Sequence, residues 1–184
     1  FCHNKNLYKN ILSKVYKYYM KILAVQSRMG IGDTVIFLPF IKALSKKFNS
    51  PISILVKENS KANQYLHQTK YIDKILILER DNKTNNRHGG FFGIFKLAND
   101  LKKYKFDKIF IFNSSLRFNL VAKISSIPQI YQYPLFAKNK QHIIEAPKKF
   151  LKKNLDLDIN EDPEVQIDSD LISKAAQKFQ IDKN

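Results

Sequence analysis

Gly30, Gly32 and Asp33 stand between two apolar runs, in the stretch SRMGIGDTVIFLPF that covers residues 27–40. Glycines at such a turn let the backbone bend tightly and approach a ligand. A carboxylate that follows them can accept hydrogen bonds from free amides at a helix start, take part in a nucleotide cradle, or act as a general base. The spacing alone favours helix capping for Asp33 and leaves the other two roles open.

Motifs for dinucleotide, triphosphate or metal binding do not stand out in the sequence. The GxG lacks the third glycine of the dinucleotide-binding fingerprint, and no GK[ST] of a Walker motif occurs. We predict no bound metal, because no carboxylate cluster completes a site and no ligand spacing relates the histidines, which are His3, His67, His88 and His142. No Ser-His-Asp order indicates a nucleophilic hydrolase.

Basic side chains that follow predicted strands form a second group of candidates. Arg117 begins a predicted helix near the same sheet edge as Asp33, and its guanidinium could bind a phosphate or carboxylate. Ser114 and Ser115 could cap that helix or contact a substrate. Further candidates for an anionic ligand are Arg28, Lys57, Lys61, Arg87 and His88. For each of these, a solvated surface position is the simpler interpretation.

The elements that must position these residues alternate along the chain. Short apolar runs predict buried strands at 21–26, 52–56, 74–78 and 108–112. Helices are predicted at 34–48, 60–68, 91–104 and 115–125, the first of them only with irregular or kinked opening turns because of Pro39. Strands separated by helix-length segments indicate an α/β fold with a doubly wound, mostly parallel, Rossmann-like sheet. The polar loop 80–92 would then lie at the ligand-binding edge of the sheet.

The net charge of +16 predicts attraction to an anion, which could be nucleic acid, a membrane surface or a phosphorylated substrate. A well-solvated lysine-rich surface explains the same charge. The apolar share of 44% is large enough for a folded core. A single cysteine, Cys2, excludes an internal disulfide and suits a reducing cytoplasm, and no apolar run is long enough to span a bilayer.

Both ends of the sequence differ from its centre. We expect residues 1–19 to be an extension, since Met20 is a natural start, although residues 7–23 could form a basic amphipathic helix that binds an anionic membrane surface. Residues 20–160 are predicted to form one domain. Residues 161–184 are predicted to be a linker and the start of a truncated second domain, with a strand at 164–168 and a helix at 171–179. We therefore expect a fragment.

Several stretches together resemble glycosyltransferase family 9, the heptosyltransferases of bacterial lipopolysaccharide assembly. KILAVQ followed by SRMGIGDTVIFLPFIKAL resembles the opening of that family. ISILVKENS, YIDKILIL and FDKIFIFNSSLRFNLVAKISSIP are similar, in the same order, to its later strands and turns. The resemblance covers roughly residues 20–133. One departure is a run from Met20 to Asp33 that is one residue longer than the commonest family form.

The resemblance implies the N-terminal, acceptor-binding half of a two-domain GT-B transferase with an inverting mechanism. Asp33 would be the catalytic base, and the expected substrate-binding residues are Gly30, Gly32, Arg28, Arg117, Ser115, Lys57 and Arg87. The acceptor would be a phosphorylated lipid A core. The nucleotide-sugar donor, of the ADP-heptose type, would bind the missing C-terminal domain, so this domain would hold no cofactor and the fragment would bind without turnover.

We further expect a cytoplasmic monomer, with peripheral contact to the inner face of the membrane and no nucleic-acid partner. Two alternatives stay open from the residues alone. One is a basic Rossmann-like module that binds nucleic acid, which only the charge supports. The other is a non-catalytic structural domain.

Overall fold

The computed structural model describes residues 19–27, 30–80, 86–135, 143–165 and 169–179. Within them lies a five-stranded sheet in the order β3-β2-β1-β4-β5, and every pair of neighbouring strands is parallel. The strands are β1 (Ile22–Val25), β2 (Ile52–Lys57), β3 (Ile72–Leu78), β4 (Lys108–Ile111) and β5 (Gln129–Gln132). The predicted α/β fold with a parallel, Rossmann-like sheet is confirmed.

Strand β1 lies at the centre of the sheet and is buried along its whole length. It pairs with β2 and β4 in register, so that Ile22 lies beside Ile52 and Lys108. Its side chains alternate between two cores: Ile22 and Ala24 belong to one, and Leu23 and Val25 to the other. A strand that is buried on both faces must be apolar throughout, which explains the continuous run ILAV.

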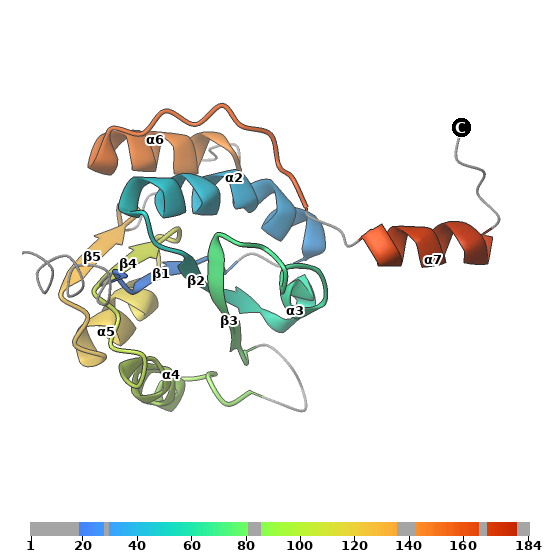
Figure 1. The fold of residues 1–184 in the computed structure, drawn as a ribbon. Coiled ribbons are helices and arrows are strands. Elements are labelled where there is room, and N and C mark those ends of the chain that lie inside the picture. The colour runs from blue at the N-terminus through green and yellow to red at the C-terminus, as the bar shows by residue number, and fades with distance from the viewer. Residues whose placement is uncertain (1–18, 28–29, 81–85, 136–142, 166–168, 180–184) are drawn as a thin grey trace, which may run out of the picture.

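Helices cover both faces of the sheet. Helices α2 (Ile31–Phe48) and α6 (Glu145–Leu155) pack on one face, and α4 (Phe92–Lys102) and α5 (Leu116–Ile124) pack on the other (Figure 1). The short η1 (Glu58–Ser60) and α3 (Ala62–Tyr65) connect β2 to β3. The sheet is therefore doubly wound, as the sequence predicted.

Helix α2 differs from the expected form. It is an uninterrupted α-helix through Pro39, so its first turns are not irregular, and the alternative of a kink stays a prediction. A proline inside a helix lacks the N–H that would bond to the preceding turn, at a cost of about 3 kcal/mol or more. The residues around it, Phe37, Leu38, Phe40 and Ile41, are all buried in the core, and their burial offsets this loss.

Two elements were missed and one is shorter than predicted. Strand β5 and helix α6 were not predicted, and the helix expected at 60–68 is only the single turn of α3. The helix predicted at 171–179 is confirmed as α7 (Ser169–Phe179), which has no buried residues. Of the strand predicted at 164–168, residues 164–165 are not extended into a strand, and the rest lies outside the described residues.

The predicted amphipathic helix at 7–23 lies mostly outside the described residues. The prediction is wrong at its end, because Ile22 and Leu23 belong to strand β1 and not to a helix. The predicted boundaries at residues 19 and 160 stay predictions. No helix in the described part of the chain is long and apolar enough to cross a membrane.

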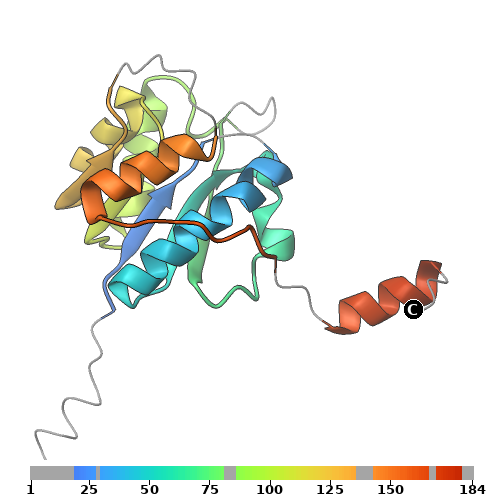
Figure 2. The ribbon, with the colours of Figure 1, turned by 90° about the horizontal axis from the view of Figure 1, so that it is seen from above.

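The segment that follows α6 crosses over α2, as Figure 2 shows. Ile159 of this segment is buried in the core. Glu161 of the same segment accepts from the ammonium groups of Lys42, at 3.0 Å, and Lys46. Burial raises the pKa of the nearby Tyr71 to about 12, and the charges of Glu164 and Glu161 add to this effect. We call residues 156–165 the strap.

Candidate site at the carboxyl edge of the sheet

The order of the strands creates one special position at the carboxyl edge. Strands β1 and β4 are neighbours in the sheet, but β2 and β3 lie between them in the sequence. The chain leaves β1 toward α2 on one face and leaves β4 toward α5 on the other face. In open parallel sheets, ligands bind in the crevice that such a divergence produces. We call the described residues that follow these two strands, 26–27, 30–34 and 112–117, the switch-point edge.

Gly30 stands at the start of α2 in a conformation that other residues avoid, with φ 111° and ψ 160°. It is the N-cap residue of the helix, and its carbonyl accepts from the Thr34 hydroxyl at 3.1 Å. A Cβ built on Gly30 would lie 3.9 Å from Oδ2 of Asp33. The carboxylate of Asp33 therefore lies close to the bare backbone of Gly30.

Asp33 lies inside the first turn of α2 and is partly exposed. The helix begins at Ile31, so the N-cap is Gly30, and the expectation that Asp33 caps the helix is wrong. A first-turn carboxylate is nevertheless favoured by the helix dipole. The side chain of Gln26, which is buried, donates to the backbone carbonyl of Asp33 at 3.4 Å and helps to hold this turn. At Gly32, an added Cβ would meet no heavy atom within 4 Å.

The loop after β4 is tied to the loop after β1 by Asn113. Its Nδ2 donates to the Ser27 hydroxyl at 2.6 Å, and its Oδ1 accepts from the backbone N–H of Ser115 at 2.6 Å. Gln132, at the end of β5, donates to the carbonyls of Asn113 and Ser115 at 3.0 and 2.9 Å. The Ser115 hydroxyl accepts from the backbone N–H of Arg117 and caps α5, as the sequence suggested.

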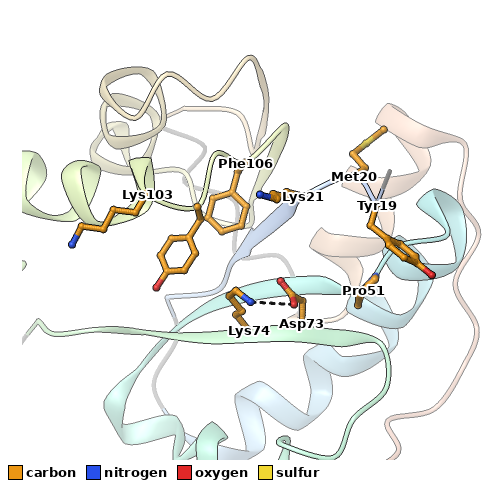
Figure 3. A pocket seen from close by; sticks show the side chains of 9 residues that line it. Tyr19, Met20, Lys21, Pro51, Asp73, Lys74, Lys103 and Phe106 are labelled. Atoms are coloured by element: carbon orange, nitrogen blue, oxygen red, sulfur yellow. Dashed lines mark hydrogen bonds and ion pairs between the residues drawn. The ribbon is translucent and has the colours of Figure 1, made fainter. Parts of the chain in front are cut away.

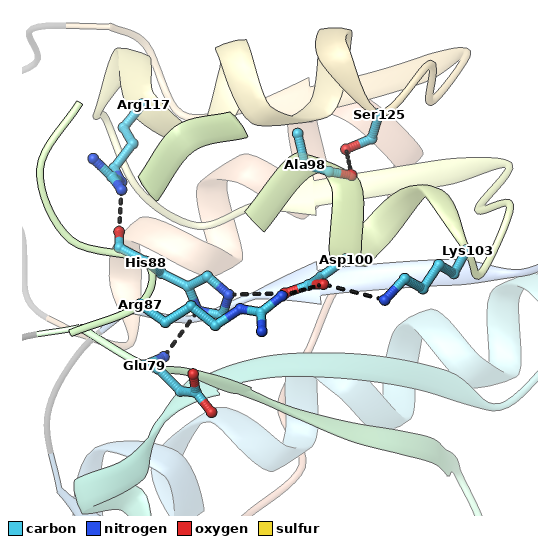
Figure 4. A network of polar contacts seen from close by, with 8 residues as sticks. All are labelled: Glu79, Arg87, His88, Ala98, Asp100, Lys103, Arg117 and Ser125. Atoms are coloured by element: carbon cyan, nitrogen blue, oxygen red, sulfur yellow. Dashed lines mark hydrogen bonds and ion pairs between the residues drawn. The ribbon is translucent and has the colours of Figure 1, made fainter. Parts of the chain in front are cut away.

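Arg117 reaches from the first turn of α5 to the loop before α4. Its guanidinium donates to the carbonyl of Gly90 at 2.7 Å and to the carbonyl of His88 (Figure 4). Gly93 makes this close approach possible, because a Cβ there would lie 2.3 Å from the backbone carbon of His88 and 2.9 Å from Nη2 of Arg117. Arg117 therefore fixes the position of the loop after β3 relative to α5.

A polar network around His88 anchors the same loop to β3 and α4. The buried imidazole accepts from the backbone N–H of Glu79 through Nδ1 at 3.1 Å, and its Nε2 lies 3.2 Å from Oδ2 of Asp100 (Figure 4). Arg87 and Lys103 contact the other oxygen of Asp100 at 2.8 and 3.3 Å. Burial by itself raises the pKa of Asp100, but the hydrogen bonds from His88 and Lys103 and the charge of Arg87 outweigh it, so the pKa lies below its ordinary value.

The predicted site residues thus fall into distinct places. Gly30, Gly32, Asp33, Ser115 and Arg117 lie at the switch-point edge. Arg87 pairs with Asp100 of α4, Lys57 ends β2, and Lys61 is the N-cap residue of α3. Arg28 lies outside the described residues. The contacts of Arg117 and Arg87 are structural, and their contact with a substrate stays a prediction.

Sequence analysis missed Asn113 and Gln132, which hold the switch-point edge together. Asn113 stands directly after a buried strand, which is the position where ligand-binding side chains gather in parallel sheets, and this signal could have found it. Gln132 follows a strand that was itself not predicted. The residues that the structure describes contain no group of three His, Cys, Asp or Glu side chains that could hold a metal ion.

A hollow of about 370 Å³ lies at the opposite, amino edge of the sheet (Figure 3). Lys74 contacts Asp73 there at 3.4 Å, and the remaining lining consists mainly of Tyr19, Met20, Lys21, Pro51, Lys103, Tyr104 and Phe106. Ligand sites of parallel sheets lie at the carboxyl edge. The hollow lies at the opposite ends of the strands from the switch-point edge, so it is not part of the candidate site.

The folded chain is similar to solved structures of sugar transferases. A glycosyl transferase of family 9 from Veillonella parvula DSM 2008 matches 88% of this chain with a TM-score of 0.68 and 18% identity. The E. coli ADP-heptose lps heptosyltransferase II matches 89% with a TM-score of 0.58 and 16% identity. The E. coli heptosyltransferase WaaC with ADP matches 77% with a TM-score of 0.52 and 12% identity.

These comparisons show that the chain shares the fold of those proteins. The chain spans about half the length of each, namely 49%, 52% and 49%. No protein-family model matches the sequence, and no curated protein matches it at a significant level.

Proposed function

We propose that this chain is the acceptor-binding half of an inverting glycosyltransferase and that Asp33 is its catalytic base. The observation that carries the proposal is the place of Asp33, in the first turn of the helix after β1, at the switch-point edge and beside the bare backbone of Gly30. The structural similarity to glycosyltransferases supports the same class of activity.

The proposed chemistry needs one base and one developing nucleophile. The acceptor hydroxyl attacks the anomeric carbon of the activated sugar, the bond from that carbon to the diphosphate oxygen breaks, and the configuration inverts. As the new bond forms, the hydroxyl becomes acidic and its proton passes to the carboxylate of Asp33. The dipole of α2 favours the negative charge that Asp33 needs for this role.

The proposed substrate class comes from the family resemblance, and the charge of the protein supports it. A net charge of +16 favours a phosphorylated acceptor, and we propose the phosphorylated core of lipid A. We propose a heptose from a nucleotide-sugar of the ADP-heptose type as the donated group. Since the similar structures are about twice as long, we place the donor in a second Rossmann-like half outside this sequence.

Acceptor binding can be tested on this chain by NMR titration with deacylated lipid A core oligosaccharide. We expect the amide signals of Gly30, Asp33, Asn113 and Ser115 to shift, and the dephosphorylated oligosaccharide to bind at least about tenfold more weakly. Unchanged signals at the switch-point edge would contradict the acceptor site. Binding of duplex DNA instead, with a steep salt dependence, would favour the nucleic-acid alternative.

Catalysis can be tested by sugar transfer in a protein that contains this chain together with the proposed donor-binding half. Replacing Asp33 by Asn should reduce kcat by about 10²–10⁴-fold, the usual range for a lost general base, while the acceptor still binds. Asp162→Asn is the matched control, because it removes the same charge from an exposed position on the strap. Transfer by Asp33→Asn at the rate of the control would show that Asp33 is not the base.

A further inference from the structure

Three phenylalanines at the start of α4 are unusually exposed. Their exposed fractions are 69% for Phe91, 76% for Phe92 and 48% for Phe95. The rings contact one another edge to face, with centroids 6.0 Å apart for Phe91 and Phe92 and 5.7 Å for Phe91 and Phe95. Clustered apolar side chains of this size on a surface indicate an interaction site. We call these three residues the Phe cluster.

Helix α5 adds a second apolar surface beside the first. Leu116, Leu120 and Ile124 recur every four residues, which places them on one stripe, and they are 44%, 43% and 40% exposed. The two helices form one layer on the sheet (Figure 1). They are joined by the Ser125 hydroxyl, which donates to the carbonyl of Ala98 at 3.1 Å. The outer side of this layer therefore carries both the Phe cluster and the α5 stripe.

The Phe cluster is held in place before any partner binds. Arg117 fixes the carbonyls of His88 and Gly90 directly ahead of Phe91. Gly93, inside the first turn of α4, packs against the backbone of His88. A preorganised apolar surface loses little conformational entropy when it docks.

The charges around the cluster identify the partner. Helices α4 and α5 carry four basic residues, Lys96, Lys102, Arg117 and Lys123, and one acidic residue, Asp100. The carboxylate of Asp100 is engaged by Arg87, His88 and Lys103. An apolar centre surrounded by exposed lysines is the pattern of proteins that bind an anionic lipid surface. Bases could stack on the rings of the Phe cluster, but the aliphatic α5 stripe beside it offers them no stacking surface and suits acyl chains better.

We propose that the Phe cluster and the α5 stripe insert into the interface of an anionic membrane, with the flanking lysines at its headgroups. The Phe cluster lies at the carboxyl edge of the sheet, where α4 begins, so docking brings the switch-point edge toward the lipid. That orientation suits a lipid-linked acceptor, and this part of the inference rests on the proposed function. Lipid binding itself does not depend on sugar transfer.

The test is cosedimentation of the full chain with vesicles of phosphatidylcholine that contain about 30% phosphatidylglycerol, compared with pure phosphatidylcholine. Phe91→Ser with Phe92→Ser should reduce the partition coefficient at least about tenfold, because two large apolar side chains no longer enter the interface. Phe179→Ser is the matched control, since this phenylalanine on α7 is 67% exposed. It should leave binding within about twofold of the wild type.

A second pair of variants separates charge from apolar contact. Lys96→Gln with Lys123→Gln should weaken binding to the anionic vesicles about tenfold and change binding to pure phosphatidylcholine little. Lys70→Gln with Lys174→Gln removes the same charge from exposed positions elsewhere and should have a smaller effect. Circular dichroism of each variant confirms that it is folded.

Three results would overturn the inference. The first is a wild-type chain that does not cosediment with anionic vesicles. The second is a folded Phe91→Ser, Phe92→Ser variant that binds them as tightly as Phe179→Ser does. The third is a wild-type dimer that this double variant converts to a monomer without loss of vesicle binding, which would assign the surface to self-association. None of them bears on the role of Asp33, because vesicle binding is measured without donor or transfer.

Discussion

Gly30 offers the sharpest test of how the turn before Asp33 is built. At φ 111° and ψ 160°, its backbone lies in a region that is essentially restricted to glycine. An alanine would either keep this conformation under strain or move the turn, and strain of this kind costs about 1–3 kcal/mol. Space is not the obstacle, because the new Cβ would lie 3.9 Å from Asp33 Oδ2.

Gly32 provides a matched control two residues away. It lies in the first turn of α2, and a Cβ there meets no heavy atom within 4 Å. Alanine is better than glycine in a helix by up to about 1 kcal/mol, so Gly32→Ala should be neutral or stabilising. The same chemical change should therefore have opposite signs at the two positions, with a difference of about 1–4 kcal/mol.

Urea unfolding followed by circular dichroism measures this difference. With a slope m of about 2 kcal/mol/M, the midpoints of the two variants should differ by about 0.5–2 M. The slopes should agree, because both variants expose the same surface when they unfold. If Gly30→Ala unfolds at the same urea concentration as Gly32→Ala, or at a higher one, the strained turn at Gly30 does not exist.

Two further predictions concern the loop after β3 and the surface under the strap. Arg117→Lys should destabilise the fold by about 1–2 kcal/mol, because a single nitrogen replaces the two guanidinium nitrogens that each donate to one of the two carbonyls. It should also speed amide exchange across residues 86–93, and exchange there at the wild-type rate would refute the anchoring role. The raised pKa of Tyr71 means that the unfolded chain loses this proton first, so stability should fall between about pH 10 and 12, by no more than about 2 kcal/mol after discount for partial exposure. In Tyr71→Phe, the urea midpoints at about pH 10 and pH 12 should differ less than in the wild type. An equal difference in both proteins would show that Tyr71 does not cause the loss of stability.

The central strands were predictable because each is a continuous apolar run. ILAV and KIFI must be buried on both faces, and few other structures tolerate such runs between helical segments. Strand β5 escaped prediction because it lies at the sheet edge, where its sequence QIYQ is largely half-buried and polar at both ends. Edge strands need no continuous apolar pattern, so sequence periodicity could not reveal it.

Helix α6 was missed for a different reason. Its lysines dominate the composition of residues 145–155, and the segment looked only basic. The three residues that dock it, Pro147, Phe150 and Leu151, are buried in the core beside α2. These three residues stabilise the helix only when they pack against another surface. Local composition does not show whether such a surface is present.

In the candidate site, too, some features follow from the local sequence and others depend on tertiary packing. Gly30 and Asp33 follow a strand and begin a helix, so their place at the carboxyl edge follows from local pattern. The bond from Asn113 to Ser27 joins residues 86 positions apart and exists only because β4 lies next to β1. Arg117 was predicted as a ligand-binding side chain, and its contacts with the loop carbonyls depend on how α4 and α5 pack.

The helix that carries Asp33 is fixed independently of any ligand. Its first turn is held by Gln26 and Thr34, and its outer side lies under the strap. The exposed ion pairs of Lys42 and Lys46 with Glu161 contribute little, whereas burial of Ile159 contributes about 1.5–3 kcal/mol. The strap is therefore held mainly by its apolar side.

This arrangement decides how an Asp33 variant should be interpreted. The contacts that position the first turn of α2 use the backbone of Asp33 and the side chains of its neighbours. The loop after β4 is held to the loop after β1 by the hydrogen bond from Asn113 to Ser27. Since the two hydrogen bonds of the first turn do not use the carboxylate, Asp33→Asn should keep the fold and lose only the interaction of the charge with the helix dipole, about 0.3–1 kcal/mol. A loss of sugar transfer in that variant would then report the loss of a proton acceptor, because the geometry around it is built from other groups.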